Sequence, residues 1–230
     1  MKKCVLLLRI GASQKLALLP ALFREGIKRM FSNEMYYGFC FDLTGKFEIP
    51  ILKISIRLRR LREDDLPQLF LCDGGVNKGS ETRKRIERVL FAYSGIGTSY
   101  VGVDEKDLPC VACWLITAMD NTKTQRYFRN GLPKLRSDEV MLEHVYTHSA
   151  HRGGNLMAWI TLNLFQEAAK CGARRAIAFV HQKNDVSLAT SLQIGWKPYM
   201  IKSVSWRLLR RKVTFQPIVV TLSSGMCTKM

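Results

Sequence analysis

The sequence contains no apolar run that approaches the roughly 20 consecutive residues needed by a transmembrane helix. Val5 to Leu8 form a short apolar stretch behind two lysines, as in a signal peptide, but Arg9 interrupts it and further basic residues follow. We therefore expect a protein that is not secreted. Internal repeats and low-complexity tracts are also lacking, which excludes a repeat architecture.

Acidic residues are scarce: the chain has 19 Asp and Glu against 36 Lys and Arg, for a net charge of +17. This excess favours acidic partners, namely phosphorylated cofactors, nucleic acid, anionic lipid or acidic proteins, without choosing among them. Nucleic acid ranks lowest, since no recognised reading motif accompanies the charge. Hydrophobic residues make up 47% of the 230 residues, so the chain can bury a core and is not globally disordered.

The seven cysteines give no sign of a disulfide framework, because they are odd in number and widely scattered. Most lie in apolar sequence, as small buried side chains do, which favours a reducing cytoplasm. Cys110 and Cys113 form a C-x-x-C pair within a stretch that predicts a buried strand. No second Cys or His pair lies nearby in the sequence at zinc-ligand spacing, so we expect no metal.

The chain divides into an N-terminal extension over 1–53, a main domain over 54–222 and a tail over 223–230. In the extension, residues 13–31 have the spacing of a basic amphipathic helix, with Ser13 as N-cap and a kink at Pro20, and 35–43 predict a strand. Two interpretations of this helix stay open. It packs on the main domain, or it lies on an anionic membrane surface.

The main domain alternates strands and helices. We expect strands at 54–61, 99–103, 110–118, 139–147 and 173–181, helices from Asp64 or Asp65 to Phe70 and at 81–93, 155–170 and 185–194, and a closing hairpin of 199–209 and 213–222. Gly74, Gly75 and Gly79 predict a loop. The polar segment 120–137 is either part of a substrate lid, through Tyr127, Phe128 and Arg129, or a disordered surface excursion.

Residues 143–196 carry the strongest functional signal. A strand leads into an Arg-Gly-Gly turn and a helix, and the next strand leads into an Asn-led helix that ends in Gly195 and Trp196. Such a turn directs backbone N–H groups at an anion, and the helix behind it adds the positive end of its dipole. The pattern favours a ligand that carries phosphate.

The order of elements resembles the GNAT acetyltransferase superfamily over roughly residues 54–215, most specifically over 139–196. That family shows V-x-P-x-x-R-G-x-G-x-G/A, then a helix, a strand, and N-x-x-A/S-x-x-x-Y-x-K-x-G-F. Here the matching residues are Arg152 and Gly153 in the first motif and Asn184, Ser187, Gly195 and Trp196 in the second. The resemblance implies an α/β (α+β) fold, a mixed and largely antiparallel sheet flanked by helices.

The chain also departs from the family's pattern at four positions. Asn155 and Met157 replace small residues of the turn, and Ser191 and Gln193 replace the usual Tyr and Lys. Asn155 tolerates unusual backbone angles, so the turn can survive, whereas Met157 adds bulk beside the phosphate. Ser191 removes the Tyr that commonly protonates the departing thiolate, and would act as a hydrogen-bond donor or water anchor.

The resemblance implies that acetyl-CoA or another acyl-CoA is bound, as a substrate, by a defined set of residues. Backbone N–H groups of Arg152, Gly153, Gly154, Asn155, Leu156 and Met157 would bind the pyrophosphate. Backbone groups of Val145, Tyr146 and Thr147 would pair with the pantetheine arm and polarise the thioester carbonyl, and Asn184 and Ser187 would lie near that arm. Each glycine also has a plain turn role, and Asn184 a plain capping role.

The implied reaction is direct transfer of an acyl group, by default acetyl, from CoA to an amine of a small molecule or peptide. Glu143 is the first candidate for the base, with Glu139, His144, Tyr146 and His148 as others. Strand alternation places Glu143 with Val145 on one face and His144 with Tyr146 on the other.

Two alternatives stay open. One is a catalytically impaired binding or regulatory module, and the other a membrane-surface acyltransferase that uses longer acyl-CoA or an acidic acyl-carrier protein. We expect a cytoplasmic monomer or homodimer, peripheral at the membrane if the helix docks there.

Overall fold

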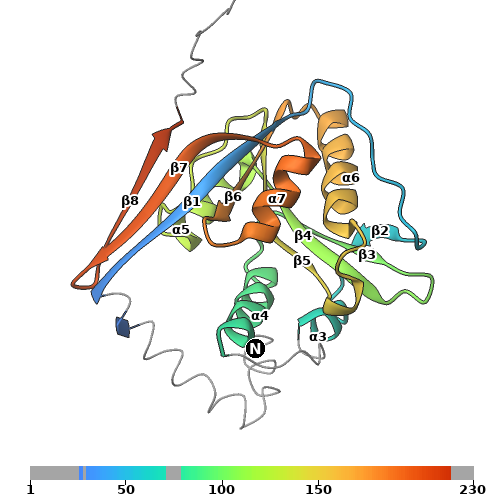
Figure 1. Ribbon diagram of the computed structural model, residues 1–230, viewed down its shortest axis with the longest axis horizontal. Coiled ribbons are helices and arrows are strands. Elements are labelled where there is room, and N and C mark those ends of the chain that lie inside the picture. Colours follow the sequence, from blue (N-terminus) through green and yellow to red (C-terminus); the bar gives the residue numbers. More distant parts are fainter. Residues whose placement is uncertain (1–25, 28–29, 71–78, 219–230) are drawn as a thin grey trace, which may run out of the picture.

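The computed structural model describes residues 26–27, 30–70 and 79–218. The amphipathic helix predicted over 13–31 lies outside the described residues except for 26, 27 and 30, as do Gly74, Gly75 and the tail 223–230. Within the described chain, one eight-stranded sheet has the order β2-β3-β4-β5-β6-β1-β7-β8 (Figure 1). The strands are β1 (Phe31–Asp42), β2 (Arg57–Arg60), β3 (Thr98–Val103), β4 (Pro109–Thr117), β5 (Glu139–Thr147), β6 (Arg175–His181), β7 (Lys197–Arg207) and β8 (Arg210–Pro217).

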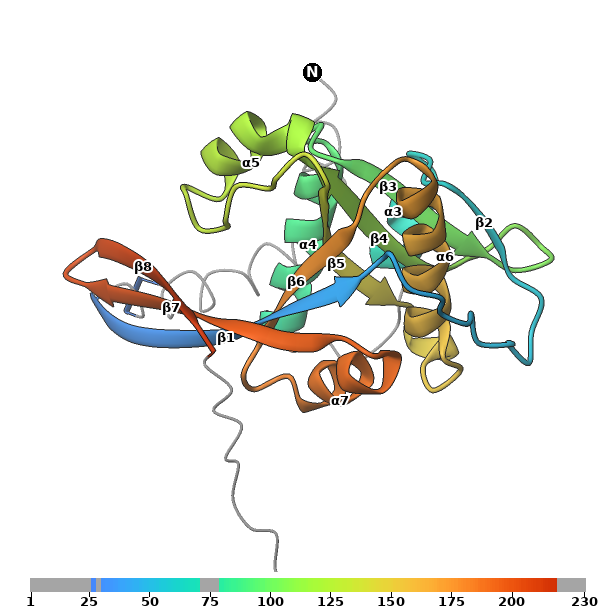
Figure 2. The same cartoon turned by 90° about the horizontal axis from the view of Figure 1, so that it is seen from above.

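The helices cover both faces of this sheet (Figure 2). They are α3 (Asp65–Phe70), α4 (Gly79–Ala92), α5 (Asn121–Tyr127), α6 (Leu156–Lys170) and α7 (Asp185–Ile194), with short 3₁₀ turns at Ala118–Asp120 and Ser149–His151. One core cluster joins the sheet to α6 and α7, and a second joins it to α3 and α4. The mixed, largely antiparallel sheet with flanking helices matches the predicted fold class.

The strand predicted at 35–43 is β1, and it lies inside the sheet between β6 and β7. It is antiparallel to both, with Tyr37 opposite Val180 of β6 and Ile201 of β7. Gly38 leaves room for its neighbours, because a Cβ atom there would stand 2.5 Å from Met200 Cγ and 2.8 Å from Phe179 Cε1. The sheet is therefore continuous only when residues from the N-terminal extension are part of it.

The segment 120–137 is neither a lid loop nor a disordered excursion. It contains α5, and the rings of Tyr127 and Phe128 pack on Phe91 of α4 with centroid distances of 5.3 and 5.7 Å. Asn121 also closes the segment on itself, since its side chain exchanges two 2.8 Å hydrogen bonds with the Leu135 backbone. Of the aromatic residues that suggested a lid, Phe128 is partly buried against the core, and Tyr127 packs at its rim with 42% of its surface exposed.

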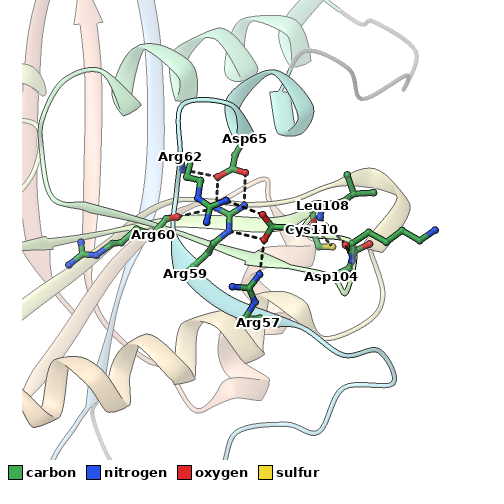
Figure 3. Close-up of polar contacts among 10 residues, drawn as sticks. Arg57, Arg59, Arg60, Arg62, Asp65, Asp104, Leu108 and Cys110 are labelled. Atoms are coloured by element: carbon green, nitrogen blue, oxygen red, sulfur yellow. Dashed lines mark hydrogen bonds and ion pairs between the residues drawn. The ribbon is translucent and has the colours of Figure 1, made fainter.

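The edge strand β2 is held to the rest of the fold by Arg59 (Figure 3). Its guanidinium donates to both Asp65 carboxylate oxygens at 2.7 and 2.8 Å, and its Nε donates to Asp107 at 3.1 Å. Asp65 opens α3, and Asp107 lies in the turn between β3 and β4. The pairing thus joins a strand, a helix and a turn through one partly buried, planar cation.

Candidate active site

The central strands β5 and β6 separate at the point where the site forms. They are the parallel pair in the sheet, and their register covers only Glu139–Met141 of β5 against Arg175–Ile177 of β6. Beyond Met141 the β5 edge that faces β6 carries no ladder to that strand. An extended ligand can therefore pair with β5 there as an added strand.

A β-bulge marks the same position on β5. Ala112 of β4 faces Tyr146 and Trp114 faces Glu143, so two β5 residues, His144 and Val145, stand opposite Cys113 alone. His144 has φ of 53°, a left-handed conformation that is costly for a residue with a Cβ atom. Strain of this kind persists where the surroundings impose it, which is typical of functional positions.

The turn before α6 adopts the shape that the sequence predicts. Gly153 and Asn155 have φ of 84° and 57°, so Asn155 holds the left-handed conformation in place of a glycine. Asn155 is the N-cap residue, and α6 runs for 15 residues from Leu156. The first N–H groups of such a helix have no intrahelical acceptor and point at any anion placed before them.

A cleft with a volume of about 180 Å³ opens between the separating strands, α6 and α7. Its lining residues are Leu142, Glu143, His144, Val145, Met157, Thr161, Ala178, Phe179, Val180, His181, Asn184, Ser187, Ser191 and Trp196. Six of these lining residues belong to the predicted site: Glu143, Val145, Met157, Asn184, Ser187 and Ser191. The cleft thus joins parts of both sequence motifs, which are about 30 residues apart in the chain.

The other predicted site residues do not line the cleft. Tyr146 and Leu156 are buried in the two cores, and Thr147, Arg152, Gly153, Gly154 and Asn155 belong to the strand end and turn beside it. The Arg152 Nε–H donates to the Thr147 carbonyl oxygen at 3.5 Å. If the strand end and the turn contact a cofactor, they do so outside the cleft.

Burial raises the pKa of Glu143 to about 7. The positive charge of Lys202 and a hydrogen bond from the His144 backbone oppose this shift without cancelling it. A carboxyl group with that pKa is partly ionised at neutral pH and can both take and return a proton. Of the five candidate bases, Glu143 alone combines a place in the cleft with a pKa near neutrality.

The bulge overturns the predicted division of the strand faces. His144 and Tyr146 do share a face, where His144 lies 4.4 Å from the Phe91 ring of α4. Glu143 lies on that face too, because Lys202, whose charge acts on Glu143, lies over the ring of Phe179, and Phe179 packs in the core beneath α3 and α4. Val145 lies on the opposite face, where it packs in the core with α6. One extra residue in a strand shifts the alternation, so both Glu143 and His144 reach the cleft.

The remaining base candidates are held elsewhere. Glu139 is 7% exposed and pairs with Arg175 at 3.0 Å, and His148 caps the turn at Ser149–His151. Burial, together with the positive charge of Arg88, lowers the pKa of His144 to about 4. His144 is therefore neutral at pH 7, but its affinity for a proton is low.

Nothing in the sequence indicates that Lys202, Tyr36 and His181 lie near the cleft. Lys202 on β7 is 8% exposed, and its Nζ lies 4.6 Å from the centre of the Tyr36 ring and 5.3 Å from that of Phe179. The Tyr36 ring meets His181 edge to face at 5.0 Å. The three come from β1, β6 and β7, and only strand pairing brings them together.

Asn184 has the capping role that sequence analysis allowed for it. Its Oδ1 accepts a hydrogen bond of 3.3 Å from the Ser187 backbone N–H at the start of α7. Ser191, one turn further, is 3% exposed and also lines the cleft. Asn184 thus fixes the start of α7, and both residues line the cleft.

The structure also describes the other features that bear on chemistry. Burial raises the pKa of the Cys110 thiol to about 11 and that of Cys113 further, so neither forms a thiolate readily. No cluster of three or more His, Cys, Asp or Glu suited to a metal ion occurs among the described residues. Helices in the described ranges are all too short or too polar to cross a bilayer.

Solved structures share this architecture. A Drosophila protein matches with a TM-score of 0.51 and 13% identity, covering 89% of this chain and 58% of its own. The GCN5-related glucosamine N-acetyltransferase region of a fungal multi-domain β-N-acetylglucosaminidase matches with a TM-score of 0.51 and 14% identity, covering 86% of this chain and 23% of its own. This chain thus spans little more than half of one matched protein and about a quarter of the other.

No protein-family model and no curated protein sequence matches the chain. At these identities the likeness concerns the fold. The chain has the fold of the GCN5-related N-acetyltransferases, the GNAT fold.

Proposed function

We propose that the protein is an N-acyltransferase that moves an acyl group from acyl-CoA to an amine, with Glu143 as the general base. The observation that carries the proposal is the partly buried carboxyl group of Glu143, with a pKa raised to about 7, in a cleft between the separated strands β5 and β6. Glucosamine N-acetylation, the activity for which the fungal neighbour is named, agrees with this reaction class.

The arrangement of the chain supports a cofactor position. The pyrophosphate of CoA would meet the turn from Arg152 to Met157, where the helix α6 begins. The pantetheine arm would run along the β5 edge at Val145–Thr147, toward Asn184 and Ser187. Met157 lines the cleft and would narrow the space for the arm.

The reaction then needs a base for the proton of the attacking amine and a source of a proton for the departing thiolate. The acceptor nitrogen attacks the thioester carbonyl carbon while the Glu143 carboxylate takes its proton, and a backbone N–H of the bulged β5 strand stabilises the oxyanion. The tetrahedral intermediate collapses to the amide and releases the CoA thiolate. Ser191 donates a hydrogen bond or holds a water there, and solvent supplies the proton of the free thiol.

The experiment measures binding and turnover separately. Acetyl-CoA and longer acyl-CoAs are titrated calorimetrically, and thiol release is followed with a panel of amines. Glu143→Gln should lower kcat/KM by roughly 10²–10⁴-fold and remove its acid limb, while acyl-CoA affinity stays unchanged. Ser187→Ala is the matched control on the opposite wall and should leave that limb in place.

Two results would count against the proposal. Failure of every CoA species to bind would remove the cofactor, and an unchanged pH profile in Glu143→Gln would remove the base. Binding without turnover by any amine would favour the regulatory module, for which Met157 and Ser191 are the relevant departures from the family pattern.

A further inference from the structure

The start of β1, the end of β7 and the start of β8 lie together and project beyond the helices, as Figures 1 and 2 both show. At this tip β7 and β8 form a hairpin in which Arg207 pairs with Arg210, and Leu208 and Leu209 make the two-residue turn. Phe31 at the start of β1 faces Arg207, and the Leu208 N–H donates to the Met30 carbonyl oxygen at 2.9 Å. The tip therefore joins two chain segments that are nearly 180 residues apart.

Large apolar side chains at this tip are exposed. Leu208, Leu209 and Phe31 expose 63%, 64% and 67% of their surface, and Met30 exposes 40%. A soluble protein carries single exposed apolar residues commonly, but a group of four at a projecting end marks a contact surface.

The turn itself is built against local preference. Leu208 and Leu209 have φ of 46° and 67°, so both occupy the left-handed region. A two-residue hairpin turn of this kind favours Asn-Gly, because a Cβ atom there is strained and apolar side chains gain nothing in water. The pair of leucines lowers the stability of the fold, which indicates that the side chains act outside it.

Positive charge surrounds the apolar tip. Arg207, Arg210 and Lys212 are exposed, and over residues 31–34 and 203–213 the only acidic residue is Glu34, which accepts a hydrogen bond from Tyr36. Trp206, next to the tip, is of a residue type that favours the boundary between water and lipid. Leucines at the end of the tip, with basic side chains behind them, match a lipid surface whose phosphate headgroups cover a hydrocarbon layer.

We infer that the tip formed by Met30, Phe31, Leu208 and Leu209 inserts into an anionic lipid surface, with Arg210 and Lys212 contacting the headgroups. The inference does not depend on the acyltransfer reaction. It also differs from docking through the helix predicted over residues 13–31, because the leucines of the hairpin make the main contact and only Met30 and Phe31 are shared.

Co-sedimentation of the full chain with vesicles tests this. The protein should bind phosphatidylcholine vesicles that contain phosphatidylserine, and bind pure phosphatidylcholine more weakly. The double variant Leu208→Asn/Leu209→Gly should lower the partition coefficient roughly tenfold or more, since two apolar side chains are lost. Because Asn-Gly suits the turn, its Tm should equal or exceed that of the wild type, which separates binding from folding.

Further variants make the test specific. Arg210→Gln and Lys212→Gln should each weaken binding to anionic vesicles by about fivefold, and not to neutral ones. Ile51→Asn and Met119→Asn, at side chains that expose 97% and 95% of their surface away from the tip, serve as matched controls and should bind as the wild type does. Absence of vesicle binding by the wild type, or equal binding by Leu208→Asn/Leu209→Gly, would overturn the inference.

Discussion

Replacing Glu143 with Gln should make the protein more stable at alkaline pH. In the folded chain burial raises the pKa of Glu143 from 4.5 to about 7, while in the unfolded chain the carboxyl group is hydrated and keeps its ordinary value. The folded state therefore binds this proton more tightly than the unfolded state does. The resulting stabilisation is complete below pH 4.5 and is lost as the pH rises through about 7.

The size of the effect follows from the shift. A rise from 4.5 to about 7 corresponds to a loss of about 3 kcal/mol in the free energy of unfolding once Glu143 is ionised. Gln has nearly the same shape and no charge at any pH, so the variant avoids this loss. At a few degrees per kcal/mol for a chain of this size, the Tm of the variant should exceed that of the wild type by roughly 6–12 °C in alkaline buffer.

His144 acts in the opposite direction and has to be separated from Glu143. Burial lowers its pKa from 6.5 to about 4, so its contribution to stability is present above pH 6.5 and is lost as the pH falls through about 4. This loss of stability at low pH should occur in both the wild type and Glu143→Gln. Only the stability at alkaline pH should differ between the two proteins.

Urea unfolding, followed by tryptophan fluorescence at about pH 5 and about pH 8.5, measures the difference. Glu105→Gln, at an exposed side chain in the turn between β3 and β4, is the control and should keep the wild-type profile. Parallel stability profiles for the wild type and Glu143→Gln would refute the assignment of a raised pKa. A more stable and less active Glu143→Gln would show that the carboxyl group is kept at a cost to the fold.

Two other variants test the surroundings of the site and the anchoring of the sheet edge. Lys202→Met should raise the pKa of Glu143 further, because the opposing positive charge is gone, and should move the acid limb of kcat/KM to higher pH by about one unit; an unmoved limb would contradict the coupling. Arg59→Met should lower the free energy of unfolding by roughly 3–5 kcal/mol in urea titration, because Asp65 would be left buried without its cation. Arg57→Met, at a side chain that is 65% exposed, is the control and should cost less than about 1 kcal/mol.

Much of the fold can be predicted from local sequence. The helices α3, α6 and α7 lie within a residue or two of their expected positions, since apolar periodicity and turn residues mark them directly. The closing hairpin was expected as well, but its turn is at Leu208 and Leu209 and not at 210–212, because leucines do not mark a turn. Asn155 takes the left-handed conformation expected of it. The segment 120–137 was harder, because α5 has a polar sequence and owes its position to the packing of Tyr127 and Phe128 on Phe91.

The site was predicted in part, for a similar reason. Glu143 was named from its place on the strand before the turn, and Met157, Asn184 and Ser191 from motif spacing, all of which are local properties. Lys202 and Tyr36 were not named, because they lie on strands that are distant in sequence and meet only through β1. Strand alternation failed at His144, since nothing in the local pattern marks a bulge.

The sequence alone determined most of the strands and helices and the left-handed backbone of the turn before α6, because these depend on neighbours within one or two turns of chain. Tertiary structure decided where β1 enters the sheet, how β5 and β6 separate, and thereby which side chains meet in the cleft. It also decided the pKa of Glu143, because burial is a property of the whole fold and not of the residues beside it.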